Sequence, residues 1–165
     1  MRVLIQRSGK ASVTVDSHVV GAIDSGLVVF VGFTDGDSIS QIEYLAKKIV
    51  NLRIFPDEEG IMNKSILDYG GKILSVSQFT LYADCKKGNR PSYIAAMNNH
   101  EAIHFYELFN DELRKYVEVE TGEFGADMDV AITNIGPTTI WLERKRRLFK
   151  KEINFPLIKF TVILF

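Results

Sequence analysis

The chain has 165 residues, of which 46% are hydrophobic and 25% are charged. This length allows one domain with a hydrophobic core but is short for two, and the composition excludes a disordered or fibrous protein. Cys85 is the only cysteine, so an intrachain disulfide is excluded and a reducing compartment is favoured.

Charge is distributed unevenly along the chain. Residues 144–165 contain seven Lys or Arg and one Glu, so this segment carries +6 and residues 1–143 carry −7 of the total of −1. The body therefore has no general basic surface for RNA, and any RNA contact there must be local. Arg2, Arg7 and Lys10 interrupt the apolar residues at the N-terminus, which argues against a signal peptide. We expect a cytoplasmic protein that needs no membrane.

The first half of the sequence predicts strands followed by a helix. Asp16 to His18 form a predicted turn, and Ser38 with Gln41 predicts a capping box at the start of a helix that ends near Val50. Residues 27–33 are apolar on both faces, which is typical of a central strand. The period-two pattern predicts four strands, at 3–7, 11–15, 19–23 and 27–33.

The second half predicts further strands and a second helix. A polar loop is expected at 83–93 and a helix from Asn99 to Val117. Further strands are expected at 53–55, 72–82, 130–133 and 138–142, the last two around a turn at 134–137. Strands that pair mainly through hairpins, with two main helices on one side, predict an α+β fold with a mostly antiparallel, barrel-like sheet.

One zinc-binding pattern is present in the predicted second helix. His100, Glu101 and His104 form the sequence H-E-x-x-H, which on a helix can bind zinc. At 100° per residue, however, both histidines lie opposite the apolar stripe that contains Ala102 and Phe105, and no later histidine supplies a third ligand. We therefore expect no metal site and no cofactor.

Two other segments carry candidate functional residues. Ser77, Gln78, Phe79 and Thr80 end an apolar strand just before a polar loop, where scaffolds often present functional groups, although a strand that simply ends here fits as well. In a regular strand Gln78 and Thr80 face one side and Ser77 the other, so we expect the first two to line a site. The segment 133–139 fits a hairpin turn.

Four motifs taken together are more specific than any one of them. They are R-V-L-I-Q-R at 2–7, S-Q-F-T-L at 77–81, K-K-G-N-R-P at 86–91 and T-N-I-G-P-T-T at 133–139. Their order and spacing resemble those of D-aminoacyl-tRNA deacylases, with Thr138 where that family more often has Val. The resemblance covers residues 1–143 and implies a homodimeric hydrolase that cuts the ester between a D-amino acid and its tRNA. The basic and then apolar tail, 144–165, departs from the family pattern and has no assigned role.

The resemblance also assigns functions to individual residues. It implies that Thr80 and Gln78, with Ser77, position the ester while the ribose 2′-hydroxyl helps to activate water. It implies that Gly136 and Pro137, joined by a cis bond, enter the partner's pocket and reject L-amino acids while admitting D-amino acids and glycine. The supporting residues are Arg7, Phe79, Asn134 and Thr139, and the expected tRNA contacts are Lys86, Lys87 and Arg90.

Two alternatives remain open at this point. The chain could be a non-catalytic tRNA-binding module that has kept the fold, in which case aminoacylated tRNA would be retained without cleavage. It could instead be a threonine-dependent hydrolase, in which the hydroxyl of Thr80 attacks the ester and its removal abolishes turnover.

Overall fold

The computed structural model describes residues 1–145, so nearly all of the predicted tail, from residue 146 on, lies outside the described residues. Within residues 1–145, none of the helices has the length and apolar character needed to cross a membrane. The elements in chain order are β1 (Arg2–Val15), β2 (His18–Ile23), β3 (Gly26–Gly32), α1 (Ile39–Val50), β4 (Phe55–Pro56), β5 (Met62–Lys64), α2 (Ile66–Tyr69), β6 (Lys72–Ser77), the 3-10 helix η1 (Phe79–Tyr82), α3 (Asn99–Arg114), β7 (Val119–Thr121) and β8 (Asp129–Glu143).

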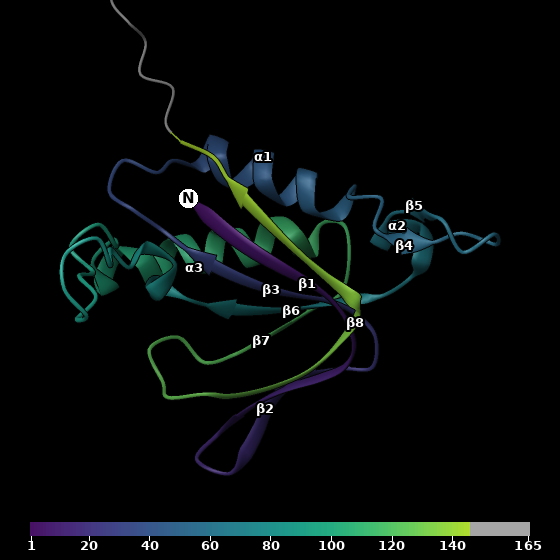
Figure 1. The fold of residues 1–165 in the computed structure, drawn as a ribbon, viewed down its shortest axis with the longest axis horizontal. Helices are drawn as coiled ribbons and strands as arrows, with labels where there is room; N and C mark the ends of the chain where they lie inside the picture. Colours follow the sequence, from purple (N-terminus) through teal and green to yellow (C-terminus); the bar gives the residue numbers. More distant parts are fainter. Residues whose placement is uncertain (146–165) are drawn as a thin grey trace, which may run out of the picture.

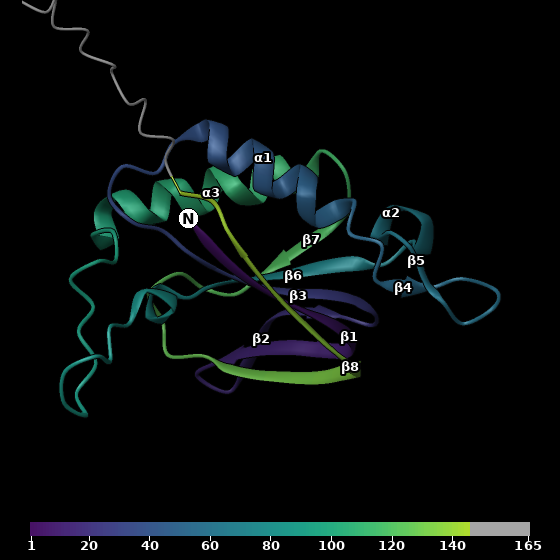
Figure 2. The same cartoon turned by 45° about the horizontal axis from the view of Figure 1, so that its top comes forward.

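The long strand β1 organises the sheet because it is paired along both of its edges. One edge pairs antiparallel with β3 and then with β2, and the other pairs antiparallel with β8 over most of its length. From β3 the sheet continues through parallel pairing to β6 and then β7. The sheet curls so that β2 approaches β7 (Figures 1 and 2). The predicted α+β fold with a barrel-like sheet is confirmed.

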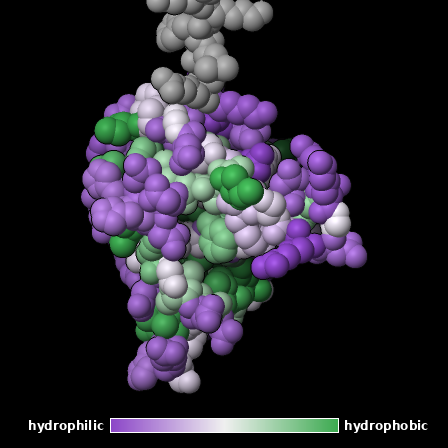
Figure 3. Space-filling view, turned by 90° about the vertical axis from the view of Figure 1, so that its left-hand side faces the viewer, coloured by the Kyte–Doolittle hydropathy of each residue, from purple (hydrophilic) through white to green (hydrophobic). Residues whose placement is uncertain are grey.

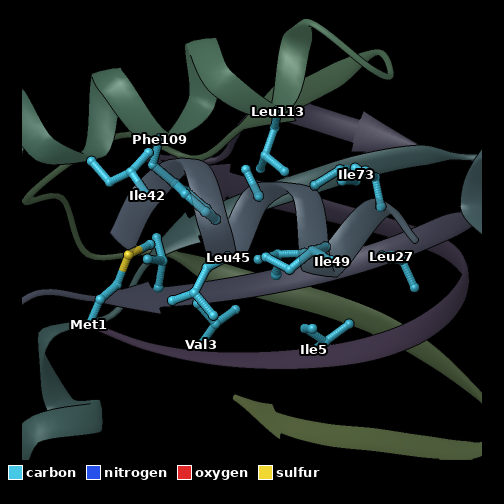
Figure 4. Packing of buried hydrophobic residues seen from close by; sticks show 14 of the residues in the cluster. Met1, Val3, Ile5, Leu27, Ile42, Leu45, Ile49, Ile73, Phe109 and Leu113 are labelled. Atoms are coloured by element: carbon cyan, nitrogen blue, oxygen red, sulfur yellow. The ribbon is translucent and has the colours of Figure 1, made fainter. Parts of the chain in front are cut away.

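Two layers of apolar side chains hold this arrangement together. Helices α1 and α3 cover one face of the sheet, and between them lie fully buried residues such as Ile5, Leu45 and Phe109 (Figure 4). A second cluster, including Val13, Val28 and Leu74, fills the inside of the curled sheet. Strand β3 contributes to both clusters, as its apolar character on both faces predicted. Each fully buried Leu, Ile or Phe contributes roughly 1.5–3 kcal/mol.

Several predicted element boundaries were wrong. The strands expected at 3–7 and 11–15 are one strand, and so are those expected at 130–133 and 138–142. In both cases an irregularity in the β1–β8 pairing takes up the extra residues without a turn. Helix α3 ends at Arg114, so Tyr116 lies beyond it and is exposed.

The capping box predicted at Ser38 and Gln41 is also wrong. Ser38 occupies the N-cap position but makes no side-chain bond to the helix backbone. Instead the buried side chain of Gln41 donates from Nε2 to the carboxylate of Asp37 at 2.9 Å and to the carbonyl of Arg144 at 2.8 Å. A true capping box, formed by Ser65 and Asp68, begins the short helix α2.

Asp37 joins the start of β1 to the end of β8. Its Oδ1 accepts from the Met1 ammonium at 2.6 Å, in an ion pair whose side chains are 0% and 3% exposed, and its Oδ2 accepts from the Thr34 amide at 2.9 Å. The Met1 ammonium also donates to the carbonyl of Arg144. Burial lowers the pKa of the Met1 amino group, and the bond to Asp37 opposes this shift. The pair is therefore a buried charge pair whose two members depend on each other.

We expect Asp37→Asn to lower the free energy of unfolding by about 3 kcal/mol, because it leaves a buried ammonium without its counter-charge. The neighbouring, exposed Asp35 is a matched control, and Asp35→Asn should change that free energy by less than about 0.5 kcal/mol. Urea denaturation followed by circular dichroism measures both. Equal stabilities for the two variants would contradict the importance of this ion pair.

Candidate active site

The segment 77–80 turns where the sequence predicted a continuing strand. Strand β6 ends at Ser77 and the 3-10 helix η1 begins at Phe79. The amide of Gln78 donates to the carbonyl of Val31 at 2.7 Å, which ties the turn to β3. A Cβ at Gly32 would lie 2.7 Å from the Gln78 carbonyl oxygen, so only glycine permits this close approach.

The turn brings Ser77 and Gln78 to one cavity of about 130 Å³. Because the strand ends, the expected separation of Ser77 from Gln78 onto opposite faces does not hold. Thr80 does not line the cavity directly, and its hydroxyl accepts from Nε2 of Gln78 at 2.5 Å. The cavity is lined by Val31, Gly32, Phe33, Ser77, Gln78, Phe79, Met97, Asn99, Ala102, Phe124 and Gly125.

The lining is mainly apolar, and its polar side chains carry no charge. None of the residues described around the cavity is a carboxylate, histidine, cysteine or lysine. The amide N–H groups of Phe79 and Thr80, at the start of η1, donate to no protein acceptor within residues 1–145. These two groups can therefore receive an oxygen atom of a bound molecule, whereas the cavity wall offers no strong base or nucleophile.

Arg2 fixes the far end of η1. Its guanidinium donates to the Leu81 carbonyl at 2.8 Å, lies 4.4 Å from the centre of the Tyr82 ring and donates to Glu143 at 2.9 Å. The bond from Arg2 lowers the pKa of Glu143, and burial raises that of the Tyr82 hydroxyl. The turn that carries Gln78 and Thr80 is thus anchored at both ends.

A larger cleft of about 430 Å³ lies beyond this anchor, between the first residues of β1, the loop 34–37 and the segment 82–86. Of the motif residues in the sequence, it contains only Arg2 and Lys86. We regard the smaller cavity as the better candidate because it contains the motif residues and is enclosed mainly by apolar side chains.

The second motif forms a bulge in β8. Gln6 pairs with Thr139 and Ser8 with Asn134. Between these two pairs β1 advances by two residues, whereas β8 advances by five. Within this bulge the Gly136–Pro137 peptide bond is cis and both residues are exposed. Gly136 has φ +118°, and a Cβ there would lie 2.7 Å from the hydroxyl oxygen of Thr138, so no other residue type fits this backbone.

Side chains from both strands hold the bulge in place. Oδ1 of Asn134 accepts from the Thr138 amide at 3.0 Å, and its Nδ2 donates to the Thr139 hydroxyl at 2.9 Å. Nε of Arg7 donates to the carbonyl of Ile135 at 3.2 Å, and Nη1 to that of Ile54 at 2.6 Å. Arg7 therefore lies beside the bulge and binds the carbonyl of Ile135, the residue before Gly136.

The bulge and the cavity lie apart within one chain. Gln78 is bonded to Val31, which pairs with Val3 of β1, whereas the bulge lies beside Arg7. Four residues along a strand span roughly 13 Å. The structure thus gathers Arg7, Asn134, Gly136, Pro137 and Thr139 at one place. It gathers Ser77, Gln78, Phe79 and Thr80 at another.

The expected tRNA contacts and the histidine pair lie on the surface. Lys86, Lys87 and Arg90 are exposed on a loop that the paired residues Asp84 and Ser92 close at its base. His100 and His104 are exposed on α3, on the face predicted for them. The expectation that no metal binds there stays a prediction.

Sequence reasoning missed much of the cavity lining. Met97, Ala102 and Phe124 come from the segment before α3, from α3 itself and from the loop before β8. Each is an ordinary apolar residue in its own segment. No local pattern marks them, because only the fold brings them together.

Comparison with known proteins decides the family. The family model described as D-Tyr-tRNA(Tyr) deacylase matches residues 4–143. The chain belongs to this family. A D-aminoacyl-tRNA deacylase of Brevibacillus brevis is 58% identical over 87% of this chain and 99% of its own length, and one of Bacillus thuringiensis is 54% identical over 88% and 100%. The resemblance inferred from the four motifs is confirmed.

Solved structures agree in fold. A protein described as c-Myc DNA unwinding element binding protein superposes with a TM-score of 0.84 at 41% identity, over 88% of this chain and 100% of that one. A probable eukaryotic D-amino acid tRNA deacylase gives a TM-score of 0.73 at 18% identity, over 86% of this chain and 97% of that one, which shows the shared fold alone.

Proposed function

We propose that the protein hydrolyses the ester bond of D-aminoacyl-tRNA in the cytoplasm and releases a free D-amino acid and tRNA. The observation that carries this proposal is the position of the family motif S-Q-F-T. Its first three residues line a mainly apolar cavity that contains no acid, base or cysteine among the residues described around it, and Thr80 is bonded to Gln78 beside it. Such a site suits an already activated ester, which needs orientation and a polarised carbonyl more than a strong protein nucleophile.

The reaction follows from these groups. The amides of Phe79 and Thr80 donate to the ester carbonyl oxygen and stabilise the negative charge that develops there. Water attacks the carbonyl carbon, the ribose 2′-hydroxyl relays its proton to the ribose 3′-oxygen, and the bond between the carbonyl carbon and that oxygen breaks to leave the 3′-hydroxyl. Gln78 and Thr80, bonded to each other, hold the turn in the conformation that aims these amides. Ser77 completes the polar side of the cavity.

A homodimer would complete the site. The bulge with Gly136 and Pro137 lies about four residues of β1 from the turn that carries Gln78, too far to reach the cavity of its own chain. A two-fold axis would place the bulge of each chain at the cavity of the other. We propose that the exposed bulge enters the partner's cavity in this way, supported by Arg7, Asn134 and Thr139.

The inserted bulge would act by exclusion. Attraction to a D side chain cannot give strong selectivity, because side chains vary in size and a few apolar contacts supply only about 1–3 kcal/mol. A rigid wall where an L side chain must project rejects every L-amino acid and admits D-amino acids and glycine. Cleavage of glycyl-tRNA is therefore part of the proposal.

Local positive charge would guide the RNA. The body of the chain is acidic, but Lys86, Lys87 and Arg90 lie on one exposed loop that follows η1. Phosphate contacts from this loop would position the tRNA without reading its sequence.

Incubation with D-tyrosyl-tRNA and L-tyrosyl-tRNA tests the proposed activity. The protein should release tyrosine from the D form only, as measured by chromatography of the free amino acid. Thr80→Ala should slow this reaction but leave measurable turnover, because no protein hydroxyl attacks the ester.

The two alternatives give different results in the same assay. A non-catalytic binding module would retain D-tyrosyl-tRNA without releasing tyrosine. A threonine-dependent hydrolase would lose all turnover in Thr80→Ala, and Thr80→Ser would trap a covalent aminoacyl-enzyme detectable by mass spectrometry. Either result would replace the proposed mechanism.

Pro137→Ala tests the exclusion of L-amino acids. Removing the rigid ring from the wall should raise the kcat/KM for L-tyrosyl-tRNA relative to D-tyrosyl-tRNA by at least about tenfold, a change of about 1.4 kcal/mol. Thr133→Ala, on an exposed position of the same strand, is the matched control and should leave the ratio unchanged. An unchanged ratio in a folded Pro137→Ala variant would remove the wall from the mechanism.

A further inference from the structure

Two exposed aromatic rings lie at the mouth of the candidate cavity. Phe79 lines the cavity, and its ring centre is 5.0 Å from that of Tyr93 in an edge-to-face arrangement at 71°. Phe79 is 53% exposed and Tyr93 40%. Among the aromatic pairs within residues 1–145, this is the only one in which both members are exposed. Large aromatic side chains usually bury most of their surface. Because these two rings remain exposed, they are available to another molecule.

The backbone holds this pair in place before any ligand binds. Asp84 and Ser92 exchange two hydrogen bonds, of 2.8 and 2.9 Å, which close the loop between them and bring Tyr93 back beside η1. After Tyr93, the amide of Met97 donates to the carbonyl of Phe33 at 3.0 Å, and the hydroxyl of Thr34 donates to the carbonyl of Ala95 at 2.6 Å. Tyr93 is therefore held on one side by the Asp84–Ser92 pair and on the other by bonds to Phe33 and Thr34, which follow β3.

The loop closed by this pair of hydrogen bonds is basic. Between Asp84 and Ser92 it contains Lys86, Lys87 and Arg90, all exposed, and carries a net charge of +2, whereas residues 1–143 as a whole carry −7. Figure 3, which views the side of the molecule where this loop lies, shows apolar side chains exposed among hydrophilic ones. Exposed aromatic rings next to local positive charge are the combination that binds single-stranded nucleic acid.

We propose that Phe79 and Tyr93 form a stacking platform for the unpaired nucleotides that precede the terminal adenosine of the tRNA. This inference rests on the proposed function, because the ester in the cavity fixes where the RNA strand leaves it. Phe79 spans the cavity and the platform, so the nucleotides next to the terminal adenosine lie over the two rings. Lys86, Lys87 and Arg90 then reach their phosphates.

The platform recognises a single strand of any sequence. Stacking uses the flat ring face, which all bases share, so the platform does not distinguish one tRNA from another. It does require unstacked bases, because a paired duplex offers no free base faces. The partner surface is therefore the single-stranded 3′ end, and the acidic body of the protein disfavours broader contact with the RNA helix.

Binding of a short single-stranded RNA that ends in C-C-A, labelled at its 5′ end, tests the platform by fluorescence anisotropy. Tyr93→Ala should weaken binding by about tenfold, the effect of one lost base stack, while Tyr93→Phe keeps the ring and should stay within about twofold of the wild type. Tyr116→Ala removes an equally exposed tyrosine beyond α3 and should have no effect. A Tyr93→Ala variant that binds like the wild type, or an equal loss in Tyr116→Ala, would overturn the proposal.

Cleavage assays separate this inference from the proposed function. Tyr93→Ala should raise KM for D-tyrosyl-tRNA by about tenfold but leave kcat/KM for D-tyrosyl-adenosine within about twofold, because the small substrate lacks the stacked nucleotides. Equal losses on both substrates would show that Tyr93 acts on the aminoacyl-adenosine in the cavity rather than on the preceding nucleotides, which would overturn the platform. If the wild type binds RNA through Tyr93 but cleaves neither substrate, the platform stands and the proposed hydrolysis fails. A change in molecular mass of Tyr93→Ala without a change in RNA binding would show that a second copy covers the rings, which also overturns the proposal.

Discussion

The pairing of β1 with β8 is the constraint on which the rest of the structure depends. β1 is shared by every antiparallel pairing of the main sheet, and β8 follows it along one edge from Arg2 to Thr14. Because β1 and β8 are paired on both sides of the bulge, the extra residues of β8 must project out of the sheet. The apolar cluster under α1 and α3 and the Met1–Asp37 ion pair keep β1 in position. The bulge is thus presented by a strand that is paired on both sides of it, and such support is what the proposed wall against L-amino acids requires.

The same strand separates the two motifs that the proposed reaction needs. The turn with Gln78 is attached to β3 opposite Val3, and the bulge lies opposite Arg7, four residues further along β1. We therefore propose that one copy does not use both motifs at the same cavity. In the proposed dimer, selectivity therefore depends on both chains, whereas turnover depends on one cavity. This arrangement also explains why the cavity can do without a charged residue among those described around it. In the proposed mechanism, orientation by backbone amides and exclusion by the partner take the place of a strong nucleophile, and the basic loop near Tyr93 attracts the RNA.

The sequence predicted the fold class, the central position of β3 and the family, because these depend on periodicity and on motifs that are contiguous in the chain. It misplaced boundaries where tertiary contacts decide them. A strand was expected to run through Thr80, but the bond from Gln78 to Val31 and the close approach at Gly32 turn the chain at Ser77. A hairpin was expected at 134–137, but β8 continues because Asn134 bridges the bulge. Ser38 and Gln41 satisfied a capping pattern, yet Asp37 and Arg144 bind the Gln41 side chain. Cavity residues such as Met97 and Phe124 carried no local signal.

A mixed dimer tests most directly the central claim that each cavity is completed by the other chain. One chain carries Ser77→Phe, which fills its own cavity but leaves its bulge intact, and the other carries Pro137→Ala, which keeps its cavity but alters its bulge. Purified through two different affinity tags, this dimer has one working cavity, and that cavity receives the intact bulge. The account predicts about half the wild-type rate on D-tyrosyl-tRNA with the full wild-type preference for D over L, although the only chain with a working cavity carries Pro137→Ala. A mixed dimer with the reduced preference of the Pro137→Ala homodimer, or a protein that is active and selective as a single chain of 18.7 kDa, would contradict it.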